Sequence, residues 1–154
     1  MARDIALRIR EKIKAETGLN ASAGISYNKF LAKLASDHRK PNGQFVISPE
    51  MGAAFVEALP VGKFHGIGPA TSAKMNRLGI FTGLDMRNRT LEFLNANFGK
   101  AGAFYYWISR GVDFGIHLRH AELGILLFGK RFAEQLAFHH IGSRDVERLA
   151  GIGN

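Results

Sequence analysis

Residues 20–47 read NASAGISYNKFLAKLASDHRKPNGQFVI, and their pattern sets the architecture of the N-terminal part of the chain. The first seven residues are small and partly β-prone, which predicts a strand. The apolar residues of FLAKL then recur at helical spacing. A turn at residues 40–43 follows, because proline fixes φ while Asn-Gly tolerates positive φ, and residues 44–47 return as a strand. The stretch therefore predicts strand, helix and strand.

Helices are predicted on both sides of this stretch. Before it, Ile5, Ile9 and Ile13 recur among basic residues up to Gly18, which indicates an amphipathic helix with a glycine stop. After it, the segment Ser48-Pro49-Glu50 offers an N-cap, a proline at the first helical position and an acid in the first turn. A helix over residues 51–59 should follow, so the chain begins helix, strand, helix, strand.

From residue 59 the pattern changes to short helices joined by glycine turns. The aromatic run at residues 104–107 could stack on bases, but its helical spacing favours a place in a core. The sequence therefore predicts an α+β fold, mainly α overall, in which an all-helical unit follows the helix–strand–helix–strand part. The helices expected in that unit cover residues 71–78, 84–88, 91–98 and 101–109.

Composition indicates a soluble protein with an anionic partner. The chain has 154 residues, 21 Lys and Arg against 13 Asp and Glu, a net charge of +8 and no cysteine. No apolar run is long enough to span a membrane, and the N-terminus is too charged for a secretion signal. A cytoplasmic location without membrane association is expected. The basic charge suits nucleic acid, although a basic but solvated surface would have the same composition.

The stretch KFHGIGPATSAKMNRLGI, residues 63–80, is the strongest candidate for a phosphate site. Two glycines around Ile67 allow a sharp turn, so that successive N–H groups can point one way beside the start of a helix at Pro69. Lys74 and Arg77 could add charge. Thr71 stands where a dinucleotide fingerprint has its third glycine. The alternative is a simple turn between two packed helices.

Two segments carry a resemblance to a known family. GIGPATSAKMNRLGI resembles a helix-hairpin-helix motif, and ASAGISYNKFLAKLASDHRKPNGQFVI resembles the late palm of the Y-family DNA polymerases, of the bacterial DNA polymerase IV type. The resemblance runs from about Ala2 to Asp113. It implies that residues 1–47 are the C-terminal half of a palm and that residues 48–113 are a linking helix and a thumb.

The family implies roles for individual residues. Lys40 matches the lysine that contacts the triphosphate of the incoming nucleotide. The hairpin matches the thumb segment that holds DNA backbone through main-chain N–H groups, at Gly66, Ile67 and Gly68. Ser22, Gly24 and Ser26 are expected to be structural. Lys29 and Lys33 are candidates to face nucleic acid, with a solvated helix face preferred for Lys33.

The resemblance also implies what this chain should lack. The family binds two Mg²⁺ ions through carboxylates that precede the matched region, and Asp4, Glu11 and Glu16 do not match them. No catalytic residue and no metal ligand is therefore predicted, and the chain alone is not expected to synthesise DNA. Half a palm would also leave an open strand edge.

Residues 114–154 match neither the family linker nor its C-terminal domain, and they are predicted to be a divergent tail, read in a shifted frame or partly disordered. Helices are expected around residues 121–138. The tail holds His117, His120, His139 and His140, but without cysteine or a pattern of acids a zinc site is disfavoured.

Three functions remain open from the sequence. The first is a fragment of a translesion DNA polymerase that contacts duplex primer-template DNA and is active only with a complementing polymerase fragment. The second is a non-catalytic module that binds DNA without sequence preference. The third is a non-functional gene remnant.

Overall fold

The computed structural model describes residues 1–113 and 124–129. The chain divides into two compact units. We call the described residues of the first unit, 1–46 and 124–129, the sheet unit, and those of the second, 47–113, the helical unit. The predicted assignment of residues 1–47 to a palm, 48–113 to a linking helix and thumb and 114–154 to a tail stays a prediction.

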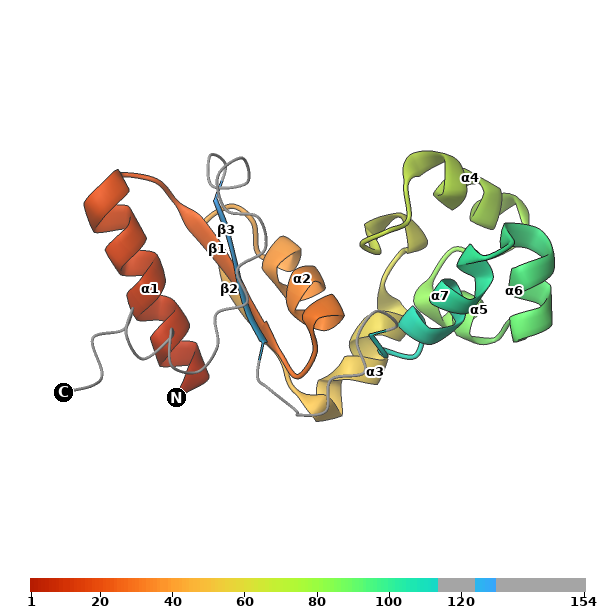
Figure 1. Cartoon of the computed structure of the whole chain (residues 1–154), viewed down its shortest axis with the longest axis horizontal. Helices are drawn as coiled ribbons and strands as arrows, with labels where there is room; N and C mark the ends of the chain where they lie inside the picture. The colour runs from red at the N-terminus through yellow and green to blue at the C-terminus, as the bar shows by residue number, and fades with distance from the viewer. Residues whose placement is uncertain (114–123, 130–154) are drawn as a thin grey trace. The chain divides into compact units, whose positions relative to one another are not determined.

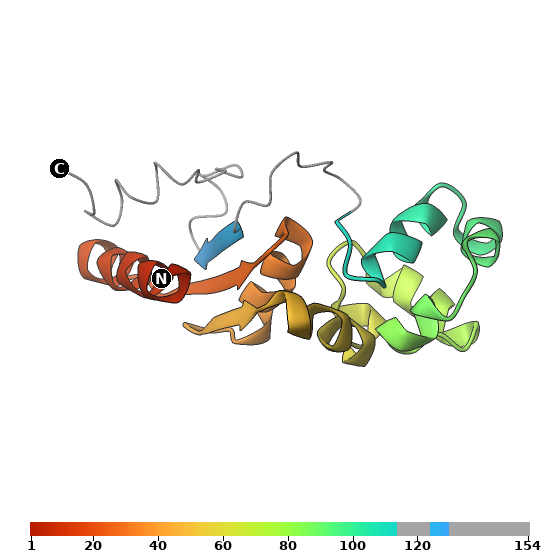
Figure 2. The same cartoon turned by 90° about the horizontal axis from the view of Figure 1, so that it is seen from below.

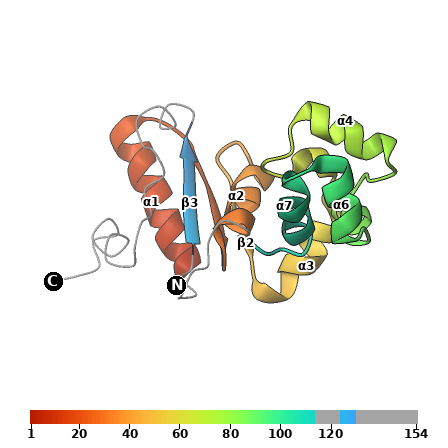
Figure 3. The ribbon, with the colours of Figure 1, turned by 45° about the vertical axis from the view of Figure 1, so that its right-hand side comes forward.

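The sheet unit is built on three strands in the order β2-β1-β3, with β1 at the centre. β2 runs parallel to β1, whereas β3 pairs with it antiparallel, so that Ala21 faces Gly129 and Ser26 faces Gly124. Figure 3 shows β3 beside β1. The elements of this unit are α1 (Ala2–Thr17), β1 (Ala21–Ser26), α2 (Lys29–His38), β2 (Gln44–Ile47) and β3 (Gly124–Gly129).

Helices α1 and α2 cover opposite faces of β1 (Figures 1 and 2). On one face, Ala6 of α1 is buried with Ala23 and Ile25. On the other, a Cβ built at Gly24 would lie 2.0 Å from the carbonyl oxygen of Ala32 in α2. Alternate residues of a strand point to opposite faces, so the close approach of α2 explains the glycine. The predicted structural role of Gly24 is confirmed.

Local signals in the sequence begin and end these helices, and those at Gly18 and Ser48 were expected. α1 stops at Gly18, which has a φ of 70°. The Asn28 side chain accepts a hydrogen bond of 2.8 Å from the N–H of Leu31 and caps α2. Ser48 occupies the N-cap position of α3 (Pro49–Ala58), but its side chain makes no capping hydrogen bond. The predicted N-cap residue, the proline at the start of the helix and the acid in its first turn are thus confirmed.

The tail departs from the prediction where it is described. Residues 124–129, GILLFG, form strand β3 rather than part of a helix. Four consecutive apolar residues between two glycines fit either structure from pattern alone, and pairing with β1 decides the outcome. β1 is therefore not the open edge that half a palm would leave, since β2 and β3 lie on its two sides.

The helical unit packs short helices around one apolar core. Pro60 and Thr82 form an isolated antiparallel β-bridge, which joins two segments of this unit that lie apart in the sequence. Buried core residues include Val56, Met75, Leu94 and Ile108. The elements are α3, the short 3-10 helix η1 (Val61–Lys63), α4 (Pro69–Arg77), α5 (Gly83–Arg87), α6 (Leu91–Phe98) and α7 (Ala101–Ile108).

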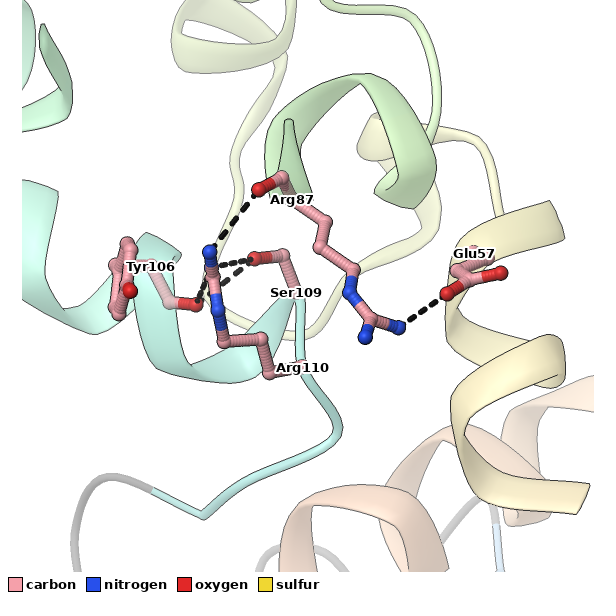
Figure 4. Close-up of polar contacts among 5 residues, drawn as sticks. All are labelled: Glu57, Arg87, Tyr106, Ser109 and Arg110. Carbon is pink, nitrogen blue, oxygen red and sulfur yellow. Dashed lines mark hydrogen bonds and ion pairs between the residues drawn. The ribbon is translucent and has the colours of Figure 1, made fainter. Parts of the chain in front are cut away.

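Polar contacts tie three of these helices together at the C-terminal end of α7 (Figure 4). The guanidinium of Arg110 donates to the main-chain oxygens of Tyr106 at 2.8 Å and of Arg87 at 3.1 Å. It also lies 3.5 Å from the centre of the Tyr106 ring. Arg87 in turn pairs with Glu57 of α3. α3, α5 and the end of α7 are thus joined through charged side chains.

The aromatic run of α7 divides between core and surface. Tyr105 is buried and makes an edge contact with Phe98 at 5.3 Å between ring centres. Trp107 is 40% exposed. The predicted core role is confirmed for Tyr105 and does not hold for Trp107.

Candidate nucleic-acid interface

The hairpin between η1 and α4 depends on its two glycines in different ways. Gly66 has a φ of 92°, which favours glycine. A Cβ at Gly66 would also lie 3.0 Å from two ring carbons of Phe104. Gly68 has a φ of −78°, and nothing lies within 4 Å of a Cβ built there. Gly66 therefore shapes the hairpin, while Gly68 leaves its outer surface bare.

Ile67, between the glycines, anchors the hairpin. Ile67 is only 6% exposed, so its side chain packs in the core and does not face a ligand. Its N–H donates to the carbonyl oxygen of Phe64 at 3.1 Å. The amide of Ile67 is thus already used within the protein, and the predicted DNA contact through that N–H is not available in this structure.

The neighbouring amides are exposed and unpaired. Within residues 1–113, the N–H groups of Gly66, Gly68 and Ala70 donate to no protein acceptor. All three residues are exposed, and Pro69 has no N–H to offer. Gly68 and Ala70 lie at the first turn of α4, where the helix dipole favours an anion. The hairpin can therefore donate hydrogen bonds to a phosphate at its backbone.

The two predicted cations of α4 differ in their surroundings. The ammonium of Lys74 donates to the main-chain oxygen of Asn97 and lies 5.1 Å from the centre of the Phe98 ring. Its charge is thus directed toward α6. Arg77 is exposed and has no partner among residues 1–113. Of the two, Arg77 is the better placed to meet an external phosphate.

Two further basic or titratable residues flank the hairpin and were missed by the sequence reasoning. Lys63 and His65 are exposed and have no ion pair or hydrogen bond within the described part of the helical unit. Both lie in the three residues before Gly66. Their proximity in sequence to the glycines is the signal that could have identified them.

The second predicted site lies in the sheet unit, at the turn between α2 and β2. Lys40 is about half exposed, and its ammonium lies 2.5 Å from Asp37 Oδ1. Asn42 takes the positive φ that the sequence predicted, 54°. Lys40 is thus held by a carboxylate of its own chain while it remains open to solvent.

Asp37 also forms an ion pair with a second lysine. Lys33 Nζ lies 3.2 Å from Asp37 Oδ2, and the Lys33 side chain is only 16% exposed. Burial raises the pKa of Asp37, but hydrogen bonds and charges from Lys40 and Lys33 outweigh it and hold the pKa below its ordinary value. The carboxylate is therefore ionised at neutral pH. The preferred reading of Lys33 as a solvated residue was wrong, and Lys29 stays a prediction.

Three of the described carboxylates each have a structural partner of their own. Asp37 pairs with lysines, Glu57 with Arg87, and Asp85 accepts from the N–H groups of Phe81 and Thr82. In the part of the chain that the structure describes, no three acidic or histidine residues could hold a metal ion together. These residues do not fit Mg²⁺. The four tail histidines lie outside the described residues.

The helices described here are too short or too polar to cross a membrane. Comparison with known proteins gives two family matches. Residues 2–37 match the impB/mucB/samB family, and residues 49–80 match the helix-hairpin-helix motif of the same family. The second match includes the hairpin with its unpaired amides.

Individual relatives extend these matches. The chain is 64% identical over 113 residues to DNA polymerase IV 2 of Agrobacterium fabrum, which covers 73% of this chain and 32% of that protein. A DinB family error-prone DNA polymerase from Sulfolobus solfataricus has a similar structure, with a TM-score of 0.66, 28% identity, and coverage of 70% of this chain and 33% of that one. A Dbh ternary complex gives a TM-score of 0.65 at 28% identity, over 70% and 32% of the two chains.

These findings define the class: the chain contains a segment of a Y-family DNA polymerase. The particular type is the bacterial DNA polymerase IV, as the sequence resemblance predicted. The chain spans about a third of the length of the relatives it matches.

Proposed function

We propose that the hairpin at residues 63–71 holds the phosphate backbone of duplex DNA without reading its sequence, as the thumb contact of a translesion DNA polymerase. The observation that supports this most is the set of unpaired amides at Gly66, Gly68 and Ala70 beside the start of α4. Main-chain donors meet the same phosphate geometry on every sequence, so such a contact positions DNA and does not select bases.

Charge supports the same function. Arg77 and Lys63 are exposed and without partners among residues 1–113, and the whole chain carries +8. Binding through phosphates releases counterions, so affinity should fall as salt rises. The family match of residues 49–80 agrees with DNA as the partner. A cytoplasmic location belongs to this proposal.

Lys40 has a separate role in the proposal. Its ammonium is a compact charge at an exposed turn, which suits a triphosphate group. Asp37 keeps it in place through a contact of 2.5 Å. We therefore assign Lys40 to the triphosphate of the incoming nucleotide and the hairpin to the DNA.

Nucleotide transfer by the chain alone is not part of this function. Among the described carboxylates, Asp37 and Glu57 form ion pairs and Asp85 caps a helix, and no three acidic or histidine residues of the described part could hold a metal ion together. A module that binds DNA without catalysis is therefore the second candidate, and it makes the same prediction for the hairpin.

Two measurements on the purified chain test the proposal. The first is binding to a short duplex as salt is raised from about 50 to 200 mM. Contacts to about two phosphates should weaken binding roughly tenfold over this range. Duplexes of different sequence should bind equally. Failure to bind at the lowest salt would remove both the thumb and the module functions.

The second measurement is primer extension with nucleotides and Mg²⁺. We expect no extension by this chain, because its described carboxylates do not form a metal site. Binding without extension supports the DNA-contact function. Extension would show that residues outside the described part supply the ligands.

A further inference from the structure

We infer that Arg10 is a positioning residue for the turn that carries Lys40. It holds that turn against the start of β1, so that the Lys40 ammonium is presented to a polyphosphate in a defined place. The inference rests on the proposed role of Lys40 and adds a residue on a different helix to that site.

The contacts of Arg10 join three segments of the sheet unit. Its Nε donates to the main-chain oxygen of Ala21, the first residue of β1, at 2.8 Å. Its Nη2 donates to the main-chain oxygen of Asn42 at 2.5 Å and to Asn42 Oδ1 at 3.0 Å. A single guanidinium on α1 therefore connects the strand with the turn that follows α2.

These contacts fall where the turn needs an external support. Asn42 has a φ of 54°, which is uncommon for residues other than glycine. It lies outside the helices and strands, so regular secondary structure does not hold it in this conformation. Both oxygens of Asn42 are satisfied by the same arginine nitrogen. The planar fork of arginine can reach Ala21 and Asn42 at once, whereas the single ammonium of a lysine cannot reproduce both sets of hydrogen bonds.

The turn is then fastened on both sides of Lys40. Before it, Asp37 contacts the Lys40 ammonium at 2.5 Å. After it, Arg10 holds Asn42, and the main-chain oxygen of Gly43 accepts from the N–H of Ala23 at 2.9 Å. Preorganisation of this kind lowers the entropy lost when a ligand is bound. Arg10 thus acts through Lys40 and need not touch the phosphate itself.

The attachment of α1 to the sheet does not depend on Arg10. Ala6 and Ile9 are buried, and Ala6 packs with Ala23 and Ile25 of β1. Removing the guanidinium should therefore loosen the turn and leave the helix docked. This separation makes a positioning role distinguishable from a general structural one.

The test uses the whole chain and inorganic tripolyphosphate as the probe, with affinity measured by calorimetry and folding by thermal melting. Lys40→Ala should remove most of the binding. Arg10→Lys keeps the charge and should weaken binding about fivefold to tenfold, the effect of one or two lost hydrogen bonds. Arg8→Lys is the matched control, because Arg8 is exposed on the same helix without a partner within residues 1–113, and it should bind like the original chain.

A double variant tests whether Arg10 acts on binding through Lys40. If Arg10 acts through Lys40, Arg10→Lys should have no further effect on binding when Lys40→Ala is already present. An equal loss in both backgrounds would overturn the positioning role. Asn42→Gly tolerates the positive φ and removes one acceptor, so it should give a smaller loss of tripolyphosphate affinity. It replaces Arg10→Lys in the test if that variant does not fold.

Two further outcomes decide between the roles of Arg10 and Lys40. Unchanged binding by folded Arg10→Lys, with binding lost in Lys40→Ala, would overturn the inference and leave the proposed function of Lys40 intact. Unchanged binding by Lys40→Ala, or no binding by the original chain, would overturn the role of Lys40 and with it the role of Arg10.

Discussion

Gly66 lies against the ring of Phe104, so close that a Cβ atom at Gly66 would be 3.0 Å from the ring carbons Cε1 and Cζ. The contact ties the hairpin before α4 to α7. Together with the φ of 92° at Gly66, it makes this glycine a requirement of the fold. Gly68, two residues later, carries neither constraint.

The two glycines should therefore differ in their effect on stability. Gly66→Ala should lower the free energy of unfolding by about 1–2 kcal/mol, because an L-residue is strained at that φ and its methyl group crowds Phe104. Gly68→Ala should change it by less than about 0.5 kcal/mol. Denaturant unfolding measures both. Equal losses would contradict the assignment of the fold requirement to Gly66.

The same pair separates folding from DNA contact. Gly68→Ala places a methyl group on the bare surface beside the exposed amides, where a phosphate must approach. We expect duplex affinity to fall severalfold in a variant that melts like the original chain. Unchanged affinity would place the DNA contact elsewhere on the chain.

Arg77 and Lys74 should contribute unequally to binding. Arg77→Ala removes an exposed charge without a partner in residues 1–113, so it should weaken duplex binding on every sequence and reduce the salt slope by about 1. Lys74→Ala should have the smaller effect on the slope, because its ammonium is directed to Asn97 and Phe98. The reverse order would show that Lys74 leaves α6 when DNA binds.

Asp85 should give the helical unit an acid-sensitive component of stability. Hydrogen bonds from the N–H groups of Phe81 and Thr82 lower the pKa of Asp85. A carboxyl whose folded pKa is lowered stabilises the fold above its unfolded pKa, about 3.9, and this contribution is lost as pH falls through the folded value. Asp85→Asn should be less stable than the original chain at neutral pH, and the difference should shrink below about pH 4. Thermal melting across this pH range checks it.

For Asp85, the informative comparison is Thr82→Ala. It removes the hydroxyl that caps α5, which accepts from the N–H of Asp85 and donates to the Asp85 carboxylate at 3.0 Å, while the two main-chain donors to the carboxylate, which are the largest causes of its lowered pKa, remain. This variant should lose about 1 kcal/mol at neutral pH and keep its acid dependence. Loss of the acid dependence in Thr82→Ala would assign it to the hydroxyl instead.

β3 should protect the sheet from self-association. A chain ended after Asp113 lacks the strand that pairs with β1 from Ala21 to Ser26, and an unpaired strand can add another chain. We expect concentration-dependent association of this shortened chain in sedimentation, and none for the full chain at the same concentrations. A monomeric shortened chain would show that β3 is not needed to cover β1.

Much of the fold could be predicted because its signals are local. The glycine stop at Gly18, the helix start at Pro49 and the apolar spacing of FLAKL act within one or two turns of the chain. Strand β3 could not be predicted in this way. Its apolar run is ambiguous on its own, and its partner β1 lies about a hundred residues earlier.

The candidate sites show the same division. The glycines and basic residues of the hairpin predicted a phosphate site from the sequence alone, but pattern could not show that the N–H of Ile67 donates to Phe64 or that Lys74 is directed to Asn97. Likewise, Lys33 had the spacing of an exposed residue, and only packing around Asp37 showed that its side chain is largely covered.

The sequence by itself determined the order of helices and strands up to about residue 109, the two glycine-dependent turns and the family resemblance, because these follow from backbone preferences and from residues adjacent in the chain. The tertiary structure alone decided which donors and charges remain available. That depends on contacts between distant segments, such as Arg10 with Asn42 and Gly66 with Phe104. Availability of a polar group is set by its neighbours in space, and those neighbours are brought together only by folding.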